Sequence, residues 1–265
     1  MRVRGSVVAV TGASRGIGRA VAKAAAARGA RVGLVARSRG DLERVLAEAG
    51  GNGVVAPADV ADRGALEEAL ALVQERLGPI DVLVNNAGVG AYGPFVDTDP
   101  AVFERLMAVN YLAAVHAMRF VLPGMLERGR GHVVNVASVA GRIAPPLEAA
   151  YAASKFALVG LSEAVDLEVA GRGVRVSVVY PGVVATSFFE ARGRPYALRR
   201  PRPIPPERVA EAVIAVVERG DGERYVPGLL RGAVVARTLA PGMARWATRF
   251  VFRRELGAWR DPPRA

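Results

Sequence analysis

The chain has 265 residues, 51% of them apolar, which is enough for one large domain with a substantial core. It has no cysteine, which excludes disulfides, thiolate metal sites and a cysteine nucleophile. Its formal net charge of +11 favours anionic partners, and the arginines crowd together between residues 192 and 260, so the basic excess belongs to the C-terminal quarter.

Short valine-rich runs alternate along the chain with alanine-rich stretches of helical length. The predicted strands cover residues 7–10, 31–36, 54–56, 81–85, 132–137, 175–180 and 224–226. The predicted helices cover residues 16–28, 41–49, 62–77, 100–128, 150–170 and 206–219. Strands of this composition are typical of a parallel sheet buried on both faces. The alternation predicts an α/β fold with a single doubly wound parallel sheet and helices on both of its faces.

Two segments interrupt this pattern. Around residues 183–205, prolines and arginines replace the periodic apolar residues, which predicts a long mobile loop over whatever the sheet binds. Beyond the main domain, residues 1–228, lies an extension, residues 229–265, that pairs an apolar stripe with recurring arginines and contains Pro241, which would interrupt any single helix. We expect this stripe to pack on the chain's own body or on a sister subunit. The alternative is an anionic membrane interface, which a basic amphipathic helix of this kind fits.

The apolar run near the N-terminus, "SVVAV", is too short for the core of a signal peptide. No stretch reaches the roughly 18 uncharged apolar residues that a membrane-spanning helix requires. We therefore expect a cytoplasmic protein. The alternative is a cytoplasmic protein whose extension contacts a membrane surface.

Three glycines, Gly12, Gly16 and Gly18, lie between the first predicted strand and the first predicted helix. Glycine permits the sharp turn and close approach that a pyrophosphate needs, and the free N–H groups at the helix start bind the anion. NAD-binding folds place an acidic residue at the end of the second strand, whereas here Arg37 follows it. Arginine binds a 2′-phosphate that a carboxylate would repel, so Arg37, with Arg15 in the glycine turn, predicts NADP. The alternative is that both are solvated surface arginines.

Only two of the 36 basic residues are lysines, and one of them is Lys155, four residues after Tyr151 on a predicted helix. This spacing places the two side chains on one face. A nearby ammonium lowers the pKa of a phenol, whose ordinary value of about 10 makes it a poor proton donor. An ammonium is also more compact than a guanidinium, so the choice of lysine predicts a crowded site in which Lys155 tunes Tyr151 for proton transfer. The alternative is an ordinary surface helix.

Over about residues 5–226 the sequence resembles the short-chain dehydrogenase/reductase family. The resemblance rests on an ordered series of motifs: TGxxxGxG at 11–18, an acidic residue with valine at 59–60, NNAG at 85–88, asparagine at 110, serine at 138, YxxxK at 151–155 and PGxVxT at 181–186. It implies that residues 1–228 form a Rossmann-fold catalytic domain that binds NADP (NADPH).

The resemblance also implies a role for each matching residue. Tyr151 would exchange a proton with the substrate, and Ser138 would hydrogen-bond the substrate oxygen. Lys155 would hold the nicotinamide ribose and tune Tyr151, while Asn110 would keep a water in a proton relay. The residues implied in cofactor binding are Gly12, Ser14, Arg15, Gly16, Ile17, Gly18, Arg37, Asp59, Val60, Asn86, Ala87, Gly88, Tyr151, Lys155, Pro181, Gly182, Val184 and Thr186.

We expect an NADP-dependent oxidoreductase that interconverts a ketone or aldehyde and its alcohol on a lipophilic substrate. Ile143 and Leu147 are expected along the substrate cavity, with Phe188, Phe189 and Tyr196 as a lid, although loop aromatics can equally pack on the body of the protein. The closest rival is reduction of a 3-oxoacyl group on an acyl carrier protein, because a basic surface suits an acidic carrier. A remote alternative is a non-catalytic NADP-binding protein on the same scaffold.

The remaining expectations concern partners. The resemblance implies a homotetramer or dimer built through the helices that carry Asn110 and Tyr151. We expect no nucleic-acid binding, because aromatic residues are not interleaved along a basic groove. Neither His116 nor His132 has an acidic or histidine neighbour at ligand spacing, so we predict no metal site.

Overall fold

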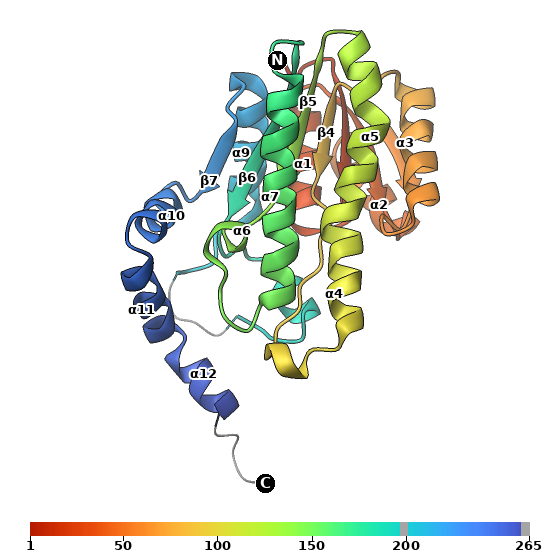
Figure 1. Cartoon of the computed structure of the whole chain (residues 1–265). Coiled ribbons are helices and arrows are strands. Elements are labelled where there is room, and N and C mark those ends of the chain that lie inside the picture. The colour runs from red at the N-terminus through yellow and green to blue at the C-terminus, as the bar shows by residue number, and fades with distance from the viewer. Residues whose placement is uncertain (197–200, 261–265) are drawn as a thin grey trace.

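The computed structural model describes residues 1–196 and 201–260, apart from the side chains of Ala258 and Arg260. In this part of the chain a single sheet has seven strands in the order β3-β2-β1-β4-β5-β6-β7 (Figure 1). All neighbouring strands pair in parallel. The strands are β1 Val7–Thr11, β2 Arg31–Ala36, β3 Gly53–Pro57, β4 Val82–Asn85, β5 Gly131–Val136, β6 Val174–Pro181 and β7 Glu223–Val226.

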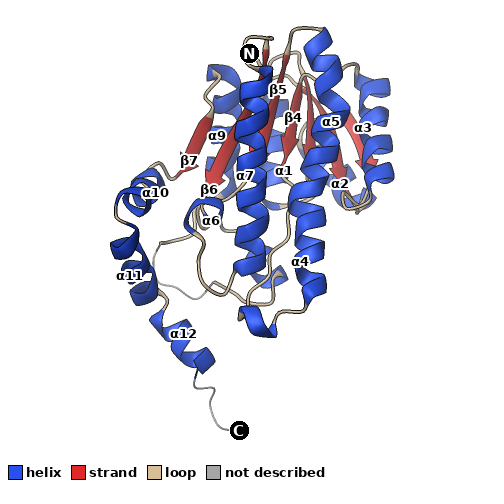
Figure 2. Cartoon of the chain, in the orientation of Figure 1, coloured by secondary structure: helices blue, strands red, loops and turns tan. Residues whose placement is uncertain are grey.

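Helices cover both faces of the sheet (Figure 2). One face carries α1 Gly16–Ala27, α2 Arg39–Glu48 and α9 Pro206–Arg219, and the other carries α3 Arg63–Leu77, α5 Ala113–Glu127 and α7 Ala149–Val169. Alternate residues of a strand point to opposite faces. Accordingly, Val8 and Val10 of β1 enter the first core, whereas Val7 and Ala9 enter the second. The predicted doubly wound α/β sheet is confirmed.

Local sequence explains where several helices begin and end. The hydroxyl of Ser38 and the carboxylate of Asp62 accept the backbone N–H groups of Asp41 and Ala65, at 3.4 and 3.1 Å, and so cap α2 and α3. At the other end of α9, Gly220 takes the left-handed conformation with φ 76°, which glycine adopts without a steric penalty.

The predicted helix at 100–128 has an irregular centre. It consists of α4 Pro100–Met107, a π-helical turn η2 Ala108–Leu112, and α5. By length and composition alone the stretch Pro100–Glu127 could span a membrane. Its apolar residues nevertheless serve the core, because Ala117, Met118 and Met125 are buried against the sheet.

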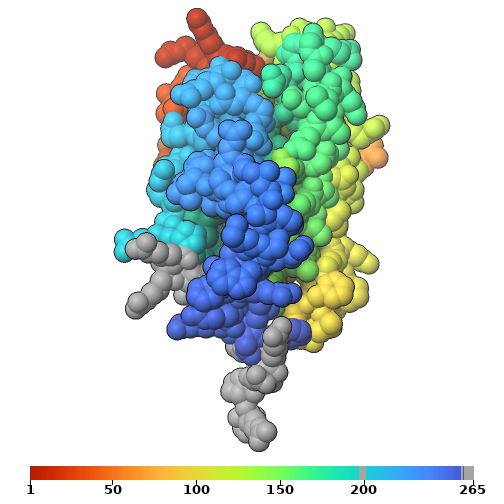
Figure 3. Space-filling model, turned by 60° about the vertical axis from the view of Figure 1, so that its left-hand side comes forward, coloured from red at the N-terminus to blue at the C-terminus, as the bar shows by residue number. Residues whose placement is uncertain are grey.

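After β7 the chain continues as α10 Leu230–Leu239, α11 Pro241–Val251 and α12 Arg253–Arg260. The break predicted at Pro241 is confirmed. These helices run along the outside of the molecule (Figure 3). The part of the extension at residues 261–265 lies outside the described residues.

The segment predicted as a mobile loop, residues 183–205, contains residues 197–200, which also lie outside the described part. Its described portion includes the short helix α8 Phe188–Ala191. A bridge joins Val184 to Ile204 and closes the base of the segment. The mobility of this segment stays a prediction.

Candidate active site

The glycine turn follows β1, where the strand order reverses between β1 and β4. Ligands of open parallel sheets bind at such a switch point, at the carboxyl ends of the strands. Gly12 has φ +66°, and a Cβ there would stand 2.8 Å from the Cα of Ala87. At Gly18 a Cβ would collide with the carbonyl oxygen of Gly12. The turn therefore needs glycine both for its conformation and for its close packing.

The loop after β4 is tied directly to this turn. The side chain of Asn86 donates to the carbonyl oxygens of Thr11 and Gly12, at 3.0 and 3.2 Å. The hydroxyl of Thr11 accepts the backbone N–H groups of Asn86 and Ala87, at 3.0 and 3.1 Å. These bonds hold the NNAG segment against the start of α1.

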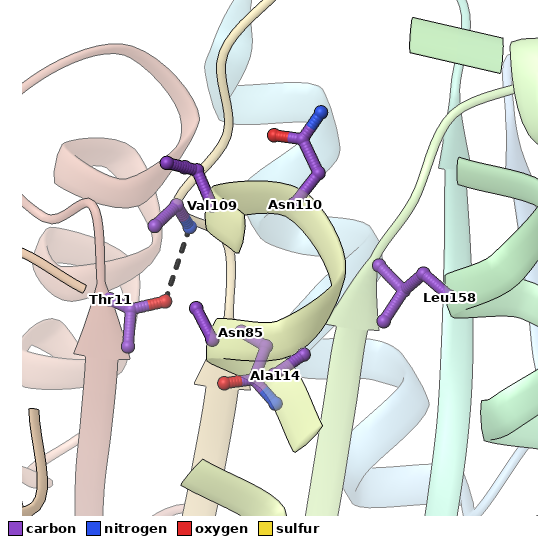
Figure 4. Close-up of a pocket in the computed structure, with 8 residues that line it drawn as sticks. Thr11, Asn85, Val109, Asn110, Ala114 and Leu158 are labelled. Atoms are coloured by element: carbon purple, nitrogen blue, oxygen red, sulfur yellow. Dashed lines mark hydrogen bonds between the residues drawn. The ribbon is translucent and has the colours of Figure 1, made fainter. Parts of the chain in front are cut away.

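Two hollows lie near this turn. The smaller, between Thr11, Asn85 and Leu158, has a volume of about 10 Å³, room for a single water (Figure 4). The larger is a cleft of about 1670 Å³ at the carboxyl ends of the strands. It is lined by Gly12, Ser14, Arg15, Gly16, Ile17, Arg37, Asp59, Val60, Asn86, Ala87, Gly88, Ser138, Tyr151, Lys155, Pro181, Gly182, Val184 and Thr186. The larger cleft is therefore the candidate site.

Ser138, Tyr151 and Lys155 meet on the inner wall of this cleft. Ser138 follows β5, and Tyr151 and Lys155 lie on the first turns of α7. The Tyr151 hydroxyl is hydrogen-bonded to Ser138. The Nζ of Lys155 lies 5.9 Å from the centre of the Tyr151 ring and donates to the carbonyl oxygen of Val136 at 3.0 Å. A phenol, a hydroxyl and an amine thus share the cleft with the glycine turn.

A family model for short chain dehydrogenases matches residues 6–196. The chain belongs to the short-chain dehydrogenase family. It is 37% identical over 225 residues to a ketoacyl reductase of a Nostoc species, an alignment that covers 84% of this chain and 78% of that one. The chain is therefore an oxidoreductase of a family that acts on CH–OH and C=O groups.

Solved structures agree with this assignment. A short chain dehydrogenase/reductase from Burkholderia phymatum in complex with NAD is 26% identical, with a TM-score of 0.84 over 92% of this chain and 96% of that one. An actinorhodin polyketide ketoreductase with NADPH is 33% identical, with a TM-score of 0.79 over 85% of this chain and 97% of that one. Both nicotinamide cofactors therefore occur among the neighbours of this short-chain dehydrogenase.

The ionisation of Tyr151 differs from the prediction. Burial raises the pKa of the phenol above its ordinary value of 10, and the hydrogen bond with Ser138 only partly opposes this rise. Burial also lowers the pKa of Lys155 to about 8. The amine is directed to Val136 rather than to the phenol oxygen, so the prediction that Lys155 lowers the pKa of Tyr151 is wrong for this geometry.

Asn110 does not line the cleft. It lies on the π-helical turn and is one of the residues that line the small void instead (Figure 4). Its amide accepts from the N–H of Val89 at 2.8 Å and donates to the carbonyl oxygen of Val89 and the hydroxyl of Ser154, each at 2.9 Å. Ser154 in turn donates to the carbonyl oxygen of Tyr151 at 2.8 Å. The asparagine side chain therefore braces the loop after β4 against α7, and the proposed water relay stays a prediction.

Gly18 is the other predicted residue that does not line the cleft. It is buried beneath Gly12, so its part is to let the first turn of α1 pack under the glycine turn. No described side chain caps α1, and no acidic residue lies in its first turn. The N–H groups of this turn are therefore available to a phosphate.

At the adenine end, Arg15 and Arg37 are both exposed and line the cleft. The sequence reasoning missed Asp41, which lines the same end. Hydrogen bonds from Ser38 and Arg44 lower the pKa of its carboxyl. Asp41 opposes an added phosphate, while Arg44 offsets its charge through an ion pair. The dinucleotide-binding pattern marks the residue next to the end of β2, whereas Asp41 lies further on, in the first turn of α2.

The substrate end is walled by apolar side chains. Ile143 and Leu147 line the cleft as predicted, and so do Phe188, Phe189 and Tyr196, the aromatics of the predicted lid. The Phe188 ring lies 5.4 Å from the Tyr151 ring. The α8 segment therefore packs directly on the ring of Tyr151.

A buried ion pair, which the sequence reasoning missed, holds this segment in place. The guanidinium of Arg192 lies 2.7 Å from Glu148, and the side chains are only 5% and 14% exposed. Arg192 also stacks on the rings of Tyr92 and Phe189, at 4.9 and 4.6 Å from their centres. Glu148 directly precedes α7, so the pair joins the lid to the helix that carries Tyr151.

We expect Arg192→Gln to raise the KM for the carbonyl substrate about tenfold or more, because removing one partner of a buried ion pair costs about 3–5 kcal/mol. Steady-state kinetics check this. Arg194→Gln is the matched control, since Arg194 stacks on the same Tyr92 ring, is exposed, and forms no ion pair with a described carboxylate. Equal KM values for the two variants would show that the pair does not hold the cleft wall.

Proposed function

We propose that the chain is an NADP-dependent oxidoreductase that interconverts a ketone or aldehyde and its alcohol on a lipophilic substrate. The observation that carries this proposal is the meeting of Ser138, Tyr151 and Lys155 in one cleft with the glycine turn. The apolar wall at the other end of that cleft supports a lipophilic substrate.

The cofactor site fits a nicotinamide dinucleotide. The glycine turn presents bare backbone, the first turn of α1 offers free N–H groups, and Asp59 with Val60 lines the adenine end. When bound there, the cofactor supplies the hydride. Lys155 would hold its ribose hydroxyls.

The chain's own residues handle the proton. Ser138 would hydrogen-bond the substrate oxygen, and the Tyr151 hydroxyl would donate its proton to that oxygen as negative charge develops there. Burial raises the pKa of the phenol, so Tyr151 carries its proton at neutral pH.

NADP is proposed over NAD because Arg15 and Arg37 both reach the adenine end of the cleft. We expect Arg37→Glu to lower kcat/KM with NADPH about 10- to 100-fold, with a smaller effect for NADH, which has no 2′-phosphate. The control is Arg39→Glu, since Arg39 pairs with Glu43 at 3.8 Å and does not line the cleft. An unchanged ratio of NADPH to NADH activity in Arg37→Glu would contradict the assignment.

A screen of carbonyl compounds with NADPH and NADH tests the function itself. Turnover of free aryl, retinoid or steroid ketones supports the proposal. The similarity to a ketoacyl reductase favours a 3-oxoacyl group on an acyl carrier protein as the second candidate. Turnover confined to carrier-bound or coenzyme A thioesters would establish that candidate instead, and no turnover of either class would remove both.

We further propose a homo-oligomer built through the helices that carry Asn110 and Tyr151. The support is apolar surface on this side of the molecule, where Leu112 is 42% exposed and Leu167 is 78% exposed. We propose a cytoplasmic location, with the extension as the part that meets a membrane.

A further inference from the structure

The C-terminal arm, residues 229–260, forms part of the cleft. It descends from β7 along the outside of the body (Figure 3). Near its end the indole N–H of Trp259 donates to the carboxylate of Asp97 at 3.2 Å, so the arm crosses to the loop before α4. Its inner side lines the substrate end of the cleft through Ala247, Thr248, Val251, Phe252 and Glu255.

The outer side of the same arm is apolar and uncovered by the described residues. At 3.6 residues per turn, Met243, Trp246 and Phe250 fall within about 60° of one another on α11. Their exposed fractions are 66%, 67% and 55%, and Leu239 at the end of α10 is 80% exposed. The rings of Trp246 and Phe250 stack with centres 5.8 Å apart. An aromatic patch of this kind marks an interaction surface.

Arginines border this patch. Residues 229–260 contain seven arginines and one carboxylate, Glu255, which is turned into the cleft. Arg245 and Arg249 lie on the flank of α11 beside Trp246, and neither forms an ion pair with a described carboxylate. The arm therefore presents unneutralised positive charge next to exposed aromatic rings.

We propose that the C-terminal arm docks on an anionic lipid surface, with Met243, Trp246 and Phe250 in the interface and the arginines on the headgroups. Charge complementarity selects this occupant. A two-fold contact with a second copy would place two copies of this patch against each other. The arginines beside the two patches would then repel one another. Docking would set the wall of the substrate cleft beside the bilayer, where a lipophilic carbonyl compound is dissolved; this last step rests on the proposed function.

The test is co-sedimentation of the full-length chain with phosphatidylcholine vesicles, with and without phosphatidylglycerol. Wild type is expected to bind the anionic vesicles. Removing two arginines with Arg245→Gln and Arg249→Gln is expected to weaken binding about 30-fold. Trp246→Ser with Phe250→Ser should abolish it, since the apolar contact is lost. The matched control is Arg76→Gln with Arg172→Gln, which removes the same charge from exposed arginines outside the arm.

Each result decides the inference. Binding that does not depend on phosphatidylglycerol, or that the control pair weakens equally, would overturn it. So would self-association that Trp246→Ser abolishes in a protein that binds no vesicle, because a second copy would then cover the patch. Carbonyl reduction without vesicles reports separately on the proposed function: none of these variants lines the cleft, so each should keep the wild-type rate. Vesicle binding without turnover of any carbonyl compound would contradict the proposed function but would still support the docking surface.

Discussion

Replacing Tyr151 with phenylalanine is expected to lower kcat for carbonyl reduction about 10²- to 10⁴-fold, with little change in KM. The ring should keep its place, because it is 8% exposed and packs against Phe188. The variant therefore loses only the hydroxyl, the group that is bonded to Ser138 and that would give its proton to the substrate oxygen. The loss corresponds to about 3–5 kcal/mol of transition-state stabilisation.

Tyr180→Phe is the matched control. Tyr180 is fully buried, its hydroxyl accepts from Arg142 at 2.8 Å, and it does not line the cleft. Both substitutions remove a buried phenol hydroxyl, so both should lower the melting temperature, whereas only Tyr151→Phe should lower kcat. Rates at neutral pH beside thermal melts separate the two effects. A Tyr151→Phe enzyme with the wild-type kcat would mean that another group supplies the proton.

The fold was predictable because burial on both faces leaves a plain trace in the sequence. Every predicted strand is present, and no strand end differs from the prediction by more than one residue. The π-helical turn at Ala108–Leu112 was not predictable. It changes the hydrogen-bond pattern without changing the apolar pattern, and Asn110 is held there by Val89 and Ser154, which lie far away in the sequence.

The site residues that belong to a motif could be predicted from the sequence. Properties that depend on how deeply a side chain is buried, or on contacts with residues distant in the sequence, could not. Spacing correctly brought Tyr151 and Lys155 to one cleft, but the pKa of Tyr151 depends on how completely the phenol is desolvated. The pairing of Glu148 with Arg192 depends on the path of the lid. The apolar stripe of the arm was visible in the sequence, whereas its inner side became part of the cleft only through the turns at Pro241 and between α11 and α12.

Lys155→Arg is expected to lower kcat at least about 100-fold although it keeps the positive charge. Lys155 is 3% exposed, and its amine is enclosed by the end of β5 and by Gly88, where a Cβ would stand 3.6 Å from Nζ. A guanidinium is broader and needs a planar set of acceptors, so it would displace the helix or the ribose site, and overpacking costs about 1–3 kcal/mol. Lys155→Met, which fits the space, should lose as much activity because it lacks the donor. Wild-type kcat in the arginine variant would show that charge alone is required.

Measurements of unfolding stability against pH test whether the Lys155 amine lies in a desolvated site. Burial lowers the pKa of Lys155 to about 8 from its ordinary value of 10.5, so the unfolded chain binds more protons between these values, and folding gains stability as the pH rises from about 8 to 10.5. Lys155→Met lacks this titration. In urea unfolding, the difference between the two proteins should therefore move in favour of wild type by about 3 kcal/mol across that range, and stay constant below pH 7. A constant difference throughout would mean that the amine is solvated, and the argument that a compact ammonium is required in a dry, crowded site would fail with it.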